Sequence, residues 1–369
     1  MNRIIIVGNG FDLEHGVKTS YKDFIEWYLG KVVEELKRDY YYKDELLEVR
    51  LQRTRCNSFE LPDYLDLDSP KEILQNIKKD GYIFECLPFL RRIISGIENK
   101  GWVDIETDYY ELLKDYALNK RGDVKQLNDE LSYIEKKLIE YLKEVENGYF
   151  SPNPIIKTFE KEIKKMIYEG IPLRDVSIKY HGSSRNKEQD KQDKQFKVVL
   201  LNFNYTKIAD QYFGNENADF FVNHIHGKLD DEDSVIFGYG DELDKKYKEI
   251  EELNDNEYLE KIKSVKYLER DNYRKLQGFI EEPFQVYIMG HSCGNSDRTL
   301  LNTLFEHENC VSIKPFYHAY KDKEGNDRDN YTEIVRNITR NFNDKQLLRE
   351  RVVNKTYCQP LPQSKIKHG

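Results

Sequence analysis

The apolar and polar positions divide the chain into three stretches. Near the N-terminus the β-branched run Ile4-Ile5-Ile6-Val7 is unbroken, which is typical of a strand covered on both faces in a parallel sheet. From about Tyr21 to about Tyr180 the spacing is helical and β-branched runs are few. A polar stretch without apolar anchors follows at 181–195, which we expect to be a mobile loop. Beyond it, short apolar runs predict strands at 196–201, 220–224, 235–237, 285–289 and 312–320.

Strands that alternate with helical or loop segments indicate an open, mainly parallel α/β sheet. The N-terminal strand would join the later strands, so we interpret the helical stretch as a large insertion into one α/β domain. The predicted domains are an α/β domain of residues 1–20 and 190–350, a helical insertion of residues 21–189 and a C-terminal tail of residues 351–369. We expect the tail to be frayed after Thr356, and the charged helical segment 245–275 to be a solvated cover.

One helix of the insertion is marked by an apolar seam with alternating steps of three and four residues. Asp123 is in place to cap its start, and the seam comprises Val124, Leu127, Leu131, Ile134, Leu138, Tyr141 and Val145. Such a seam can join two subunits or pack against helices of the same chain. We favour packing within the chain, because three heptads more often do that.

Charge and composition exclude several classes of protein. The 369 residues carry a net charge of −9, which argues against a general nucleic-acid surface because phosphate binding needs clustered cations. No apolar stretch is long enough for a membrane span and no leader segment is recognisable, so we expect a cytoplasmic protein without membrane contact. The five cysteines are scattered and include no Cys-x-x-Cys pair, so neither a disulfide framework nor a zinc ribbon is expected.

The first strand runs directly into a glycine turn, Gly8-Asn9-Gly10-Phe11-Asp12. Gly8 and Gly10 allow a sharp turn and leave no side chain between the main chain and a ligand. A helix that begins near Asp12 would point unpaired amides at the same place and favour a phosphate. The motif lacks the third glycine of the usual dinucleotide fingerprint, so a plain strand-to-helix turn explains it equally well.

Three more motifs follow predicted strands, at the edge where open α/β sheets bind ligands. Asn204 follows the strand at 196–201 and is suited to hold a ribose hydroxyl or a water, or to tie down a turn. His224 and His226 are two residues apart, so strand periodicity would aim both at one face. The strand at 285–289 ends in a loop of small residues, 290–297, which suits close approach by a nucleotide.

Several segments in a fixed order carry a family resemblance. They are the opening Gly-Asn-Gly-Phe-Asp, the Thr-Ser-Tyr-Lys-Asp-Phe of 19–24, Trp102 with Asp104 and Glu106, the Asn-Phe-Asn-Tyr-Thr of 202–206 and the His-Ile-His-Gly of 224–227. In this order they resemble the AbiH family of phage abortive-infection proteins over nearly the whole chain. The resemblance implies a role in phage defence.

The chain is more distantly similar to the sirtuin-like NAD-binding domains, which also have a Gly-x-Gly turn, an asparagine at a strand end, a His-Gly and a late Gly-x-Ser. That similarity implies a Rossmann-like sheet with Asn204 and His226 as catalytic residues, the asparagine holding the nicotinamide ribose and the attacking water and the histidine acting as base. It also implies a cofactor site made of Gly8, Asn9, Gly10, Asp12, Ser20, Gly227, Gly290, Ser292 and Asp297.

Two departures from the sirtuin-like pattern bear on the chemistry. Sirtuin-like enzymes often have Tyr-Asp after the asparagine, whereas this chain has Tyr205-Thr206. The chain also lacks a cysteine-based zinc module, so protein deacetylation is not expected. The resulting hypothesis is hydrolysis of NAD to nicotinamide and ADP-ribose without a metal. Such an activity harms its own cell, so it is expected to be restrained until infection, with a phage-derived trigger or assembly into a homo-oligomer as the candidate means of control.

Two other functions compete with this hypothesis. One is a metal-dependent phosphoesterase, with candidate ligands His224, His226, His291, Asp12 and Asp297. It ranks second among enzymes, because such a site expects an early Asp-x-His and residues 3–7 contain no ligand. The other is a nucleotide-binding sensor without catalysis, in which the helical insertion transmits the state of the pocket to a partner.

Overall fold

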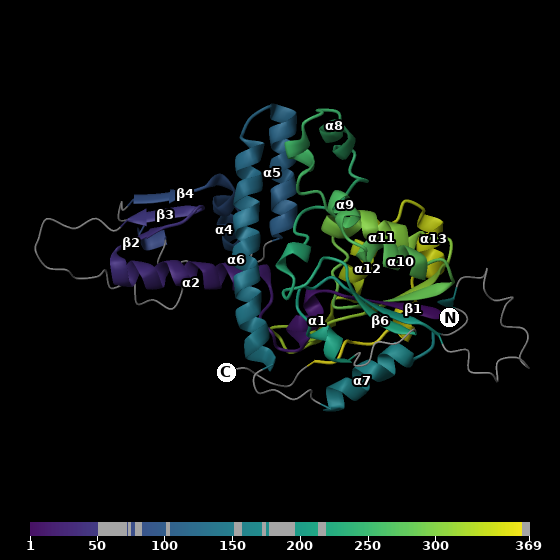
Figure 1. Cartoon of the computed structure of the whole chain (residues 1–369). Coiled ribbons are helices and arrows are strands. Elements are labelled where there is room, and N and C mark those ends of the chain that lie inside the picture. The colour runs from purple at the N-terminus through teal and green to yellow at the C-terminus, as the bar shows by residue number, and fades with distance from the viewer. Residues whose placement is uncertain are drawn as a thin grey trace, which may run out of the picture. The chain divides into compact units, whose positions relative to one another are not determined.

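Five apolar strands pair into one parallel sheet (Figure 1). The computed structural model describes residues 1–50, 72, 75–77, 83–100, 104–150, 157–171, 175–176, 196–212 and 219–363. The stretch 181–195, predicted as a mobile loop, and Trp102 lie outside the described residues. The chain divides into two units: the first comprises Met1–Lys18, Lys143–Glu249 and Lys261–Gly369, and the second Thr19–Leu142 and Ile250–Glu260.

The parallel sheet belongs to the first unit and confirms most of the predicted strands. In spatial order its strands are β6 (Phe220–His224), β5 (Val198–Asn202), β1 (Asn2–Val7), β7 (Phe284–Met289) and β8 (Cys310–Phe316). The chain therefore adds strands to one side of β1 and then crosses to the other side, between β1 and β7. Open α/β sheets bind ligands at such a switch point, beyond the carboxyl ends of the strands.

Two of the predicted strands differ from the structure. Residues 235–237 form no strand, because they follow a short 3₁₀ helix (Glu232–Ser234) and Ile236 donates its N–H to the His226 carbonyl instead of joining the sheet. The run 312–320 is divided: β8 ends at Phe316, and β9 (Ala319–Lys321) pairs antiparallel with β10 (Asp327–Asp329) in a separate hairpin.

Both faces of the sheet are covered, as the β-branched run predicts. Ile4 and Ile6 belong to an apolar cluster that includes residues of α10, α11 and α12, whereas Ile5 and Val7 belong to a cluster that includes residues of α1 and α7. The helices of the first unit are α1 (Asn9–Glu14), α7 (Lys157–Tyr168), α9 (Lys263–Lys266), α10 (Asn272–Phe279), α11 (Arg298–Phe305), α12 (Tyr331–Arg340) and α13 (Lys345–Arg351).

The second unit combines helices with a small antiparallel sheet. Its helices are α2 (Tyr21–Asp39), α4 (Pro88–Lys100) and α5 (Ile105–Asn119), while α6 (Val124–Phe150) and α8 (Tyr247–Glu251) each contribute residues to both units. Within the described ranges, none of the helices has the length and apolarity needed to cross a membrane.

The small sheet of the second unit was not predicted, because the stretch reads as helical throughout. It consists of β2 (Tyr41–Lys43), β3 (Leu47–Arg50) and β4 (Ile83–Cys86). Asp44, in the turn between β2 and β3, accepts hydrogen bonds from the hydroxyls of Tyr28 at 2.8 Å, Tyr42 at 2.6 Å and Tyr133 at 3.3 Å. One carboxylate therefore ties the hairpin to α2 and α6, a long-range contact that periodicity does not reveal.

The apolar seam is confirmed as one side of α6. Asp123 accepts a hydrogen bond from the N–H of Gln126 at 3.0 Å, so it caps the helix start as predicted. The seam residues from Val124 to Tyr141 are buried in the single chain, and Tyr141 contacts the rings of Phe24 and Trp27. Packing within the chain accounts for the seam without a second copy.

The C-terminal residues were predicted to be frayed after Thr356, and for residues 357–363 that prediction is wrong. The N–H of Tyr317 donates to the Gln359 carbonyl, and the N–H of Leu361 donates to the Tyr317 carbonyl at 2.8 Å. Leu361 is 3% exposed and belongs to the apolar cluster of Ile5 and Val7. The segment is ordered by a β-bridge and one buried side chain.

Replacing Leu361 with alanine tests this packing. We expect Leu361→Ala to lower the free energy of unfolding by about 2–5 kcal/mol, since the buried side chain leaves a cavity. Leu268→Ala is the matched control, because Leu268 is 76% exposed and should lose less than about 0.5 kcal/mol. Urea unfolding followed by circular dichroism measures both, and equal losses would show that the C-terminal segment is not packed.

Candidate functional site

The four predicted turn motifs meet at the carboxyl edge of the parallel sheet. Gly8 follows β1, Phe203 follows β5, Ile225 follows β6 and Gly290 follows β7. All four strands are parallel neighbours, so their ends are adjacent. The local pattern of each strand, an apolar run that stops at polar or glycine residues, therefore places chemically active residues from distant parts of the chain together.

The glycine turn after β1 packs directly on the turn after β7. Gly10 donates its N–H to the Gly290 carbonyl at 2.8 Å. Gly290 has φ +74°, and a Cβ at this residue would lie 2.0 Å from the Phe11 nitrogen. A Cβ on Gly8 would lie 2.7 Å from the Cα of His291. Close backbone packing is therefore sufficient to explain these glycines, whether or not a ligand also approaches them.

Asp12, Asn204 and Thr206 form a buried polar group on one side of this turn, here called the Asp12 group. Asn204 Nδ2 donates to Asp12 Oδ1 at 2.9 Å and to the Gly8 carbonyl at 3.1 Å. Thr206 Oγ1 donates to Asp12 Oδ2 at 2.6 Å. Burial raises the pKa of Asp12 to about 7, despite these two donors, which favour the ionised carboxylate. A carboxyl that titrates near neutral pH is suited to general acid or base chemistry.

The Asp12 group also gives a physical reason for Thr206. Sirtuin-like enzymes often have aspartate at this position, whereas here the Thr206 side chain faces the Asp12 carboxylate. A second carboxylate at 206 would place two like charges in contact in a buried site, whereas the threonine hydroxyl donates a hydrogen bond.

A second group of buried polar side chains, here called the Asp297 group, forms around the Asp297 carboxylate. Lys263 Nζ lies 2.7 Å from Asp297 Oδ1, and His226 Nε2 lies 3.3 Å from the same oxygen. His291 Nε2 lies 3.5 Å from Asp297 Oδ2. The Tyr267 hydroxyl lies 3.0 Å from His226 Nε2. His226 and His291 follow β6 and β7, Lys263 begins α9, and Tyr267 and Asp297 belong to short 3₁₀ helices, Tyr267–Glu269 and Asn295–Asp297.

The charges within the Asp297 group determine which forms are present. Burial opposes ionisation of Asp297, but the Lys263 ammonium and the two imidazoles hold its pKa well below the usual range. Burial and the Lys263 ammonium lower the pKa of His226 to about 3, against the attraction of Asp297. At neutral pH the group therefore contains an ionised carboxylate, an ammonium and a neutral imidazole at 226.

The Asp12 group and the Asp297 group lie beside the same glycine turn but contact different atoms of Gly8. The Gly8 carbonyl accepts from Asn204, whereas the Cα side of Gly8 faces His291. The Phe203 ring makes edge contacts with His226 and with His291, at centroid distances of 5.0 and 4.3 Å. Asn204 and His226, the predicted catalytic pair, are thus held in separate hydrogen-bond networks.

The other predicted cofactor residues have varied surroundings. Asn9 and Ser292 are exposed beside the glycine turns. Gly227 has φ +82°, and a Cβ there would lie 2.1 Å from the Ser234 carbonyl oxygen. Ser20 belongs to the second unit, where its hydroxyl accepts from the Asp23 N–H at 3.1 Å in a capping box at the start of α2. These contacts give Gly227 and Ser20 a structural role.

Lys263 and Tyr267 are not among the residues predicted from the sequence for the site. Both lie in the segment 245–275, which we expected to be a solvated cover, yet Lys263 is only 1% exposed. Its neighbour Ile262 is also 1% exposed, and that apolar residue was the one local sign of burial. The partner of Lys263 is 34 residues away in sequence, so no local pattern connects the two.

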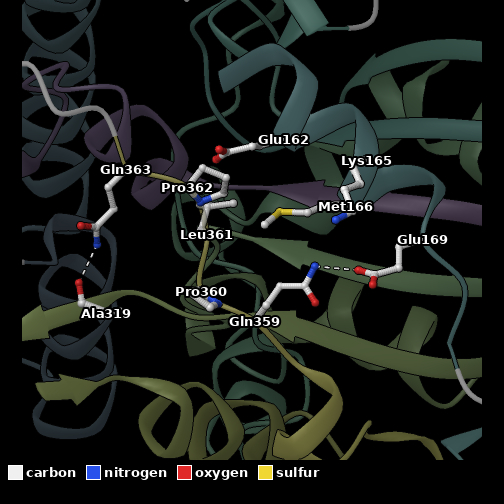
Figure 2. A pocket seen from close by; sticks show the side chains of 10 residues that line it. All are labelled: Glu162, Lys165, Met166, Glu169, Ala319, Gln359, Pro360, Leu361, Pro362 and Gln363. Atoms are coloured by element: carbon white, nitrogen blue, oxygen red, sulfur yellow. Dashed lines mark hydrogen bonds between the residues drawn. The ribbon is translucent and has the colours of Figure 1, made fainter. Parts of the chain in front are cut away.

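Among the residues that the structure describes, no three histidine, cysteine, aspartate or glutamate side chains are arranged to hold a metal ion. A cavity of about 930 Å³ lies between α7 and residues 359–363, with Glu162, Lys165 and Met166 on its α7 side (Figure 2). None of the predicted site residues lines it, so it is separate from the candidate site.

Comparison with known proteins identifies the family. No curated protein and no solved structure matches the chain significantly. The family model described as "Bacteriophage abortive infection AbiH" matches residues 4–318. The match covers both the Asp12 group and the Asp297 group. Because it spans most of the chain, this protein belongs to the AbiH family, and that membership implies a role in phage defence by abortive infection.

Proposed function

We propose that this AbiH protein hydrolyses NAD to nicotinamide and ADP-ribose in the cytoplasm during abortive infection. The observation that carries the proposal is that the Asp12 group and the Asp297 group each have a residue against Gly8, Asn204 in the first and His291 in the second, at the switch point of a parallel sheet. The strand order around β1 is that of Rossmann-like sheets, which bind dinucleotides at this point. This order supports the proposed Rossmann-like, sirtuin-like fold.

The proposed reaction breaks the bond between the nicotinamide nitrogen and C1′ of the ribose. A water oxygen forms the new bond to C1′, the electron pair of the broken bond passes to nicotinamide, and the water proton passes to a base. Positive charge develops on the sugar, as in glycoside hydrolysis. Buried carboxylates near the sugar would stabilise that charge, and a positioned base contributes about 10²–10⁴ in rate.

The residues available for this chemistry are already placed by the fold. Asn204 is partly exposed and is held by Gly8 and Asp12, so its amide can present an oxygen to the ribose and the water. Asp12 titrates near neutral pH and is the nearest acid to that amide. His226 is neutral and has a ring nitrogen that can accept a proton, but its pKa of about 3 makes it a weaker base than Asp12; we keep it as the predicted base beside Asp12.

The accessible residues around the turns are suited to the rest of the dinucleotide. Asn9 and Ser292 are exposed, and Gly10 and Gly290 are partly exposed. In the proposal Gly8, Asn9 and Gly10 lie along the pyrophosphate, and Gly290 with Ser292 accommodates the adenosine half. Unrestrained cleavage of NAD would harm the cell, so a phage-derived trigger, a homo-oligomer or both control the reaction.

One observation favours a second function, that of a nucleotide sensor without catalysis. The amide of Asn204 and the Nε2 of His226 both have partners inside the protein. Such a site can bind a nucleotide through backbone groups and report its presence without reacting. Binding of NAD without cleavage under every condition would identify this function.

Replacement of Asn204 tests the proposed hydrolysis. Purified protein, alone or with isolated phage components, should convert NAD to nicotinamide and ADP-ribose, and Asn204→Ala should slow this by about 10²-fold because the nucleophile is no longer oriented. Chromatography of the products measures the rate. Asn326→Ala, in the exposed β9–β10 hairpin, is the control and should leave the rate unchanged.

Intact NAD under every condition would refute the proposed hydrolysis. Equal rates for wild type and Asn204→Ala would refute the role of the asparagine alone. Circular dichroism of each variant distinguishes loss of chemistry from loss of folding.

A further prediction concerns the titration of Asp12. Its pKa is about 7 in the folded protein and about 3.9 in the unfolded chain, so between these values the folded state retains a proton that the unfolded state has released. The free energy of unfolding therefore falls as pH rises. Between about pH 5 and pH 8, wild type should lose about 2 kcal/mol more stability than Asp12→Asn, which has no carboxyl to ionise. Urea unfolding at both pH values measures this, and parallel losses would show that Asp12 titrates normally.

A further inference from the structure

Lys263 is a buried cation at the centre of the Asp297 group. Its side chain is 1% exposed, and its ammonium lies 2.7 Å from Asp297 Oδ1. The main chain fixes this position, because the N–H of Lys263 donates to the Tyr239 carbonyl at 2.9 Å. A Cβ on Gly240 would lie 3.3 Å from the Cβ of Lys263, so residues 239 and 240 pack closely on the start of α9.

The hydrogen bonds around His291 define its tautomer. The backbone N–H of Cys293 donates to His291 Nδ1 at 3.0 Å, so that nitrogen has a lone pair and no proton. In the neutral ring the proton is therefore on Nε2, which faces Asp297 Oδ2 at 3.5 Å. His291 thus acts as a donor toward Asp297.

The state of His226 depends on the balance of charge around its Nε2. That atom lies 3.3 Å from an Asp297 oxygen and 3.0 Å from the Tyr267 hydroxyl. The Asp297 carboxylate attracts a proton to the imidazole, whereas the nearby Lys263 ammonium repels it. With Lys263 present the two charges offset each other, and a buried imidazole without a net negative neighbour remains neutral.

We infer that Lys263 is a positioning residue that keeps His226 neutral by balancing the negative charge of Asp297. His226 Nε2 then carries no proton and accepts a hydrogen bond from the Tyr267 hydroxyl. Without Lys263, the same carboxylate would convert His226 to an imidazolium, which cannot act as a base. The inference deepens the proposed function, because His226 is the base proposed there, but the charge relation itself can be measured without NAD.

The test is nuclear magnetic resonance of the full-length protein with isotope-labelled histidine. The spectrum of His226→Gln identifies the His226 signal among the eight histidines of the chain. In wild type the ring should stay neutral from about pH 5 to pH 8, whereas in Lys263→Met its apparent pKa should rise above about 6. Lys263→Arg keeps the positive charge and should keep the ring neutral.

A double variant isolates the cause of the change. In Lys263→Met with Asp297→Asn both charges are absent, so His226 should return to the neutral form. Two lysines are controls that should leave the His226 signal unchanged: Lys266 is on the same helix and pairs with Glu269, and Lys314 is buried at a different place in the first unit. Lys266→Met controls for a local change, and Lys314→Met for the loss of a buried cation.

Each outcome decides the inference. An unchanged His226 titration in folded Lys263→Met would overturn it, as would a ring that stays protonated in the double variant. If Lys263→Met does not fold, the single variant Asp297→Asn decides the question. This variant removes the carboxylate and keeps the Lys263 ammonium, so His226 must stay neutral. An imidazolium at 226 in this variant overturns the inference.

The NAD assay separates failure of this inference from failure of the proposed function. If NAD is cleaved, Lys263→Met should shift the acid limb of the rate–pH profile upward, since protonated His226 is inactive. A shifted titration without any NAD cleavage supports the role of Lys263 and refutes the hydrolysis. Cleavage with an unshifted titration and profile refutes the role of Lys263 alone.

Discussion

The site depends on a backbone contact between the turn after β1 and the turn after β7. Gly10 donates to the Gly290 carbonyl, and the Cα of Gly8 packs on His291, so the two turns approach more closely than side chains would allow. This contact lies at the switch point between β1 and β7, where the order in which the chain adds strands reverses. Because it is made by main-chain atoms, it brings the Asp12 group to one side of Gly8 and the Asp297 group to the other, with little freedom in either.

Buried charge is the main energetic cost of this arrangement. Moving a carboxylate and an ammonium out of water opposes folding, and their mutual attraction repays the cost only with good geometry and further hydrogen bonds. Asp297 meets that condition through Lys263 and two imidazoles. Asp12 does not, because its partners are neutral donors, and burial therefore raises its pKa. The same edge of the sheet thus contains one carboxylate held ionised and one near its titration point, which is the contrast that acid and base chemistry requires.

The sequence predicts the parts of this structure that depend on local pattern. The run from Ile4 to Val7 indicates a strand covered on both faces, and abrupt polar residues after apolar strands place the site at their carboxyl ends. Contacts across long stretches of chain are not predictable in this way. Lys263 is one charged residue among many until Asp297 is beside it. The segment of Leu361 is ordered by hydrogen bonds from Leu361 to Tyr317 and from Tyr317 to Gln359, and the hairpin at Asp44 by three tyrosines from separate elements.

The internal hydrogen bonds of the site bear on how an abortive-infection protein is restrained. Asn204 donates to Gly8 and Asp12, and His226 Nε2 is hydrogen-bonded to the Tyr267 hydroxyl. For the proposed hydrolysis, substrate must replace some of these partners, and each exchange forfeits a buried hydrogen bond unless the ligand supplies an equivalent one. A few such exchanges cost several kcal/mol, which is enough to keep a site inactive until a second interaction stabilises the open arrangement. Under the proposed function, a phage-derived trigger would not have to create a catalytic group. It would only have to bind the arrangement in which Asn204 no longer donates to the Gly8 carbonyl.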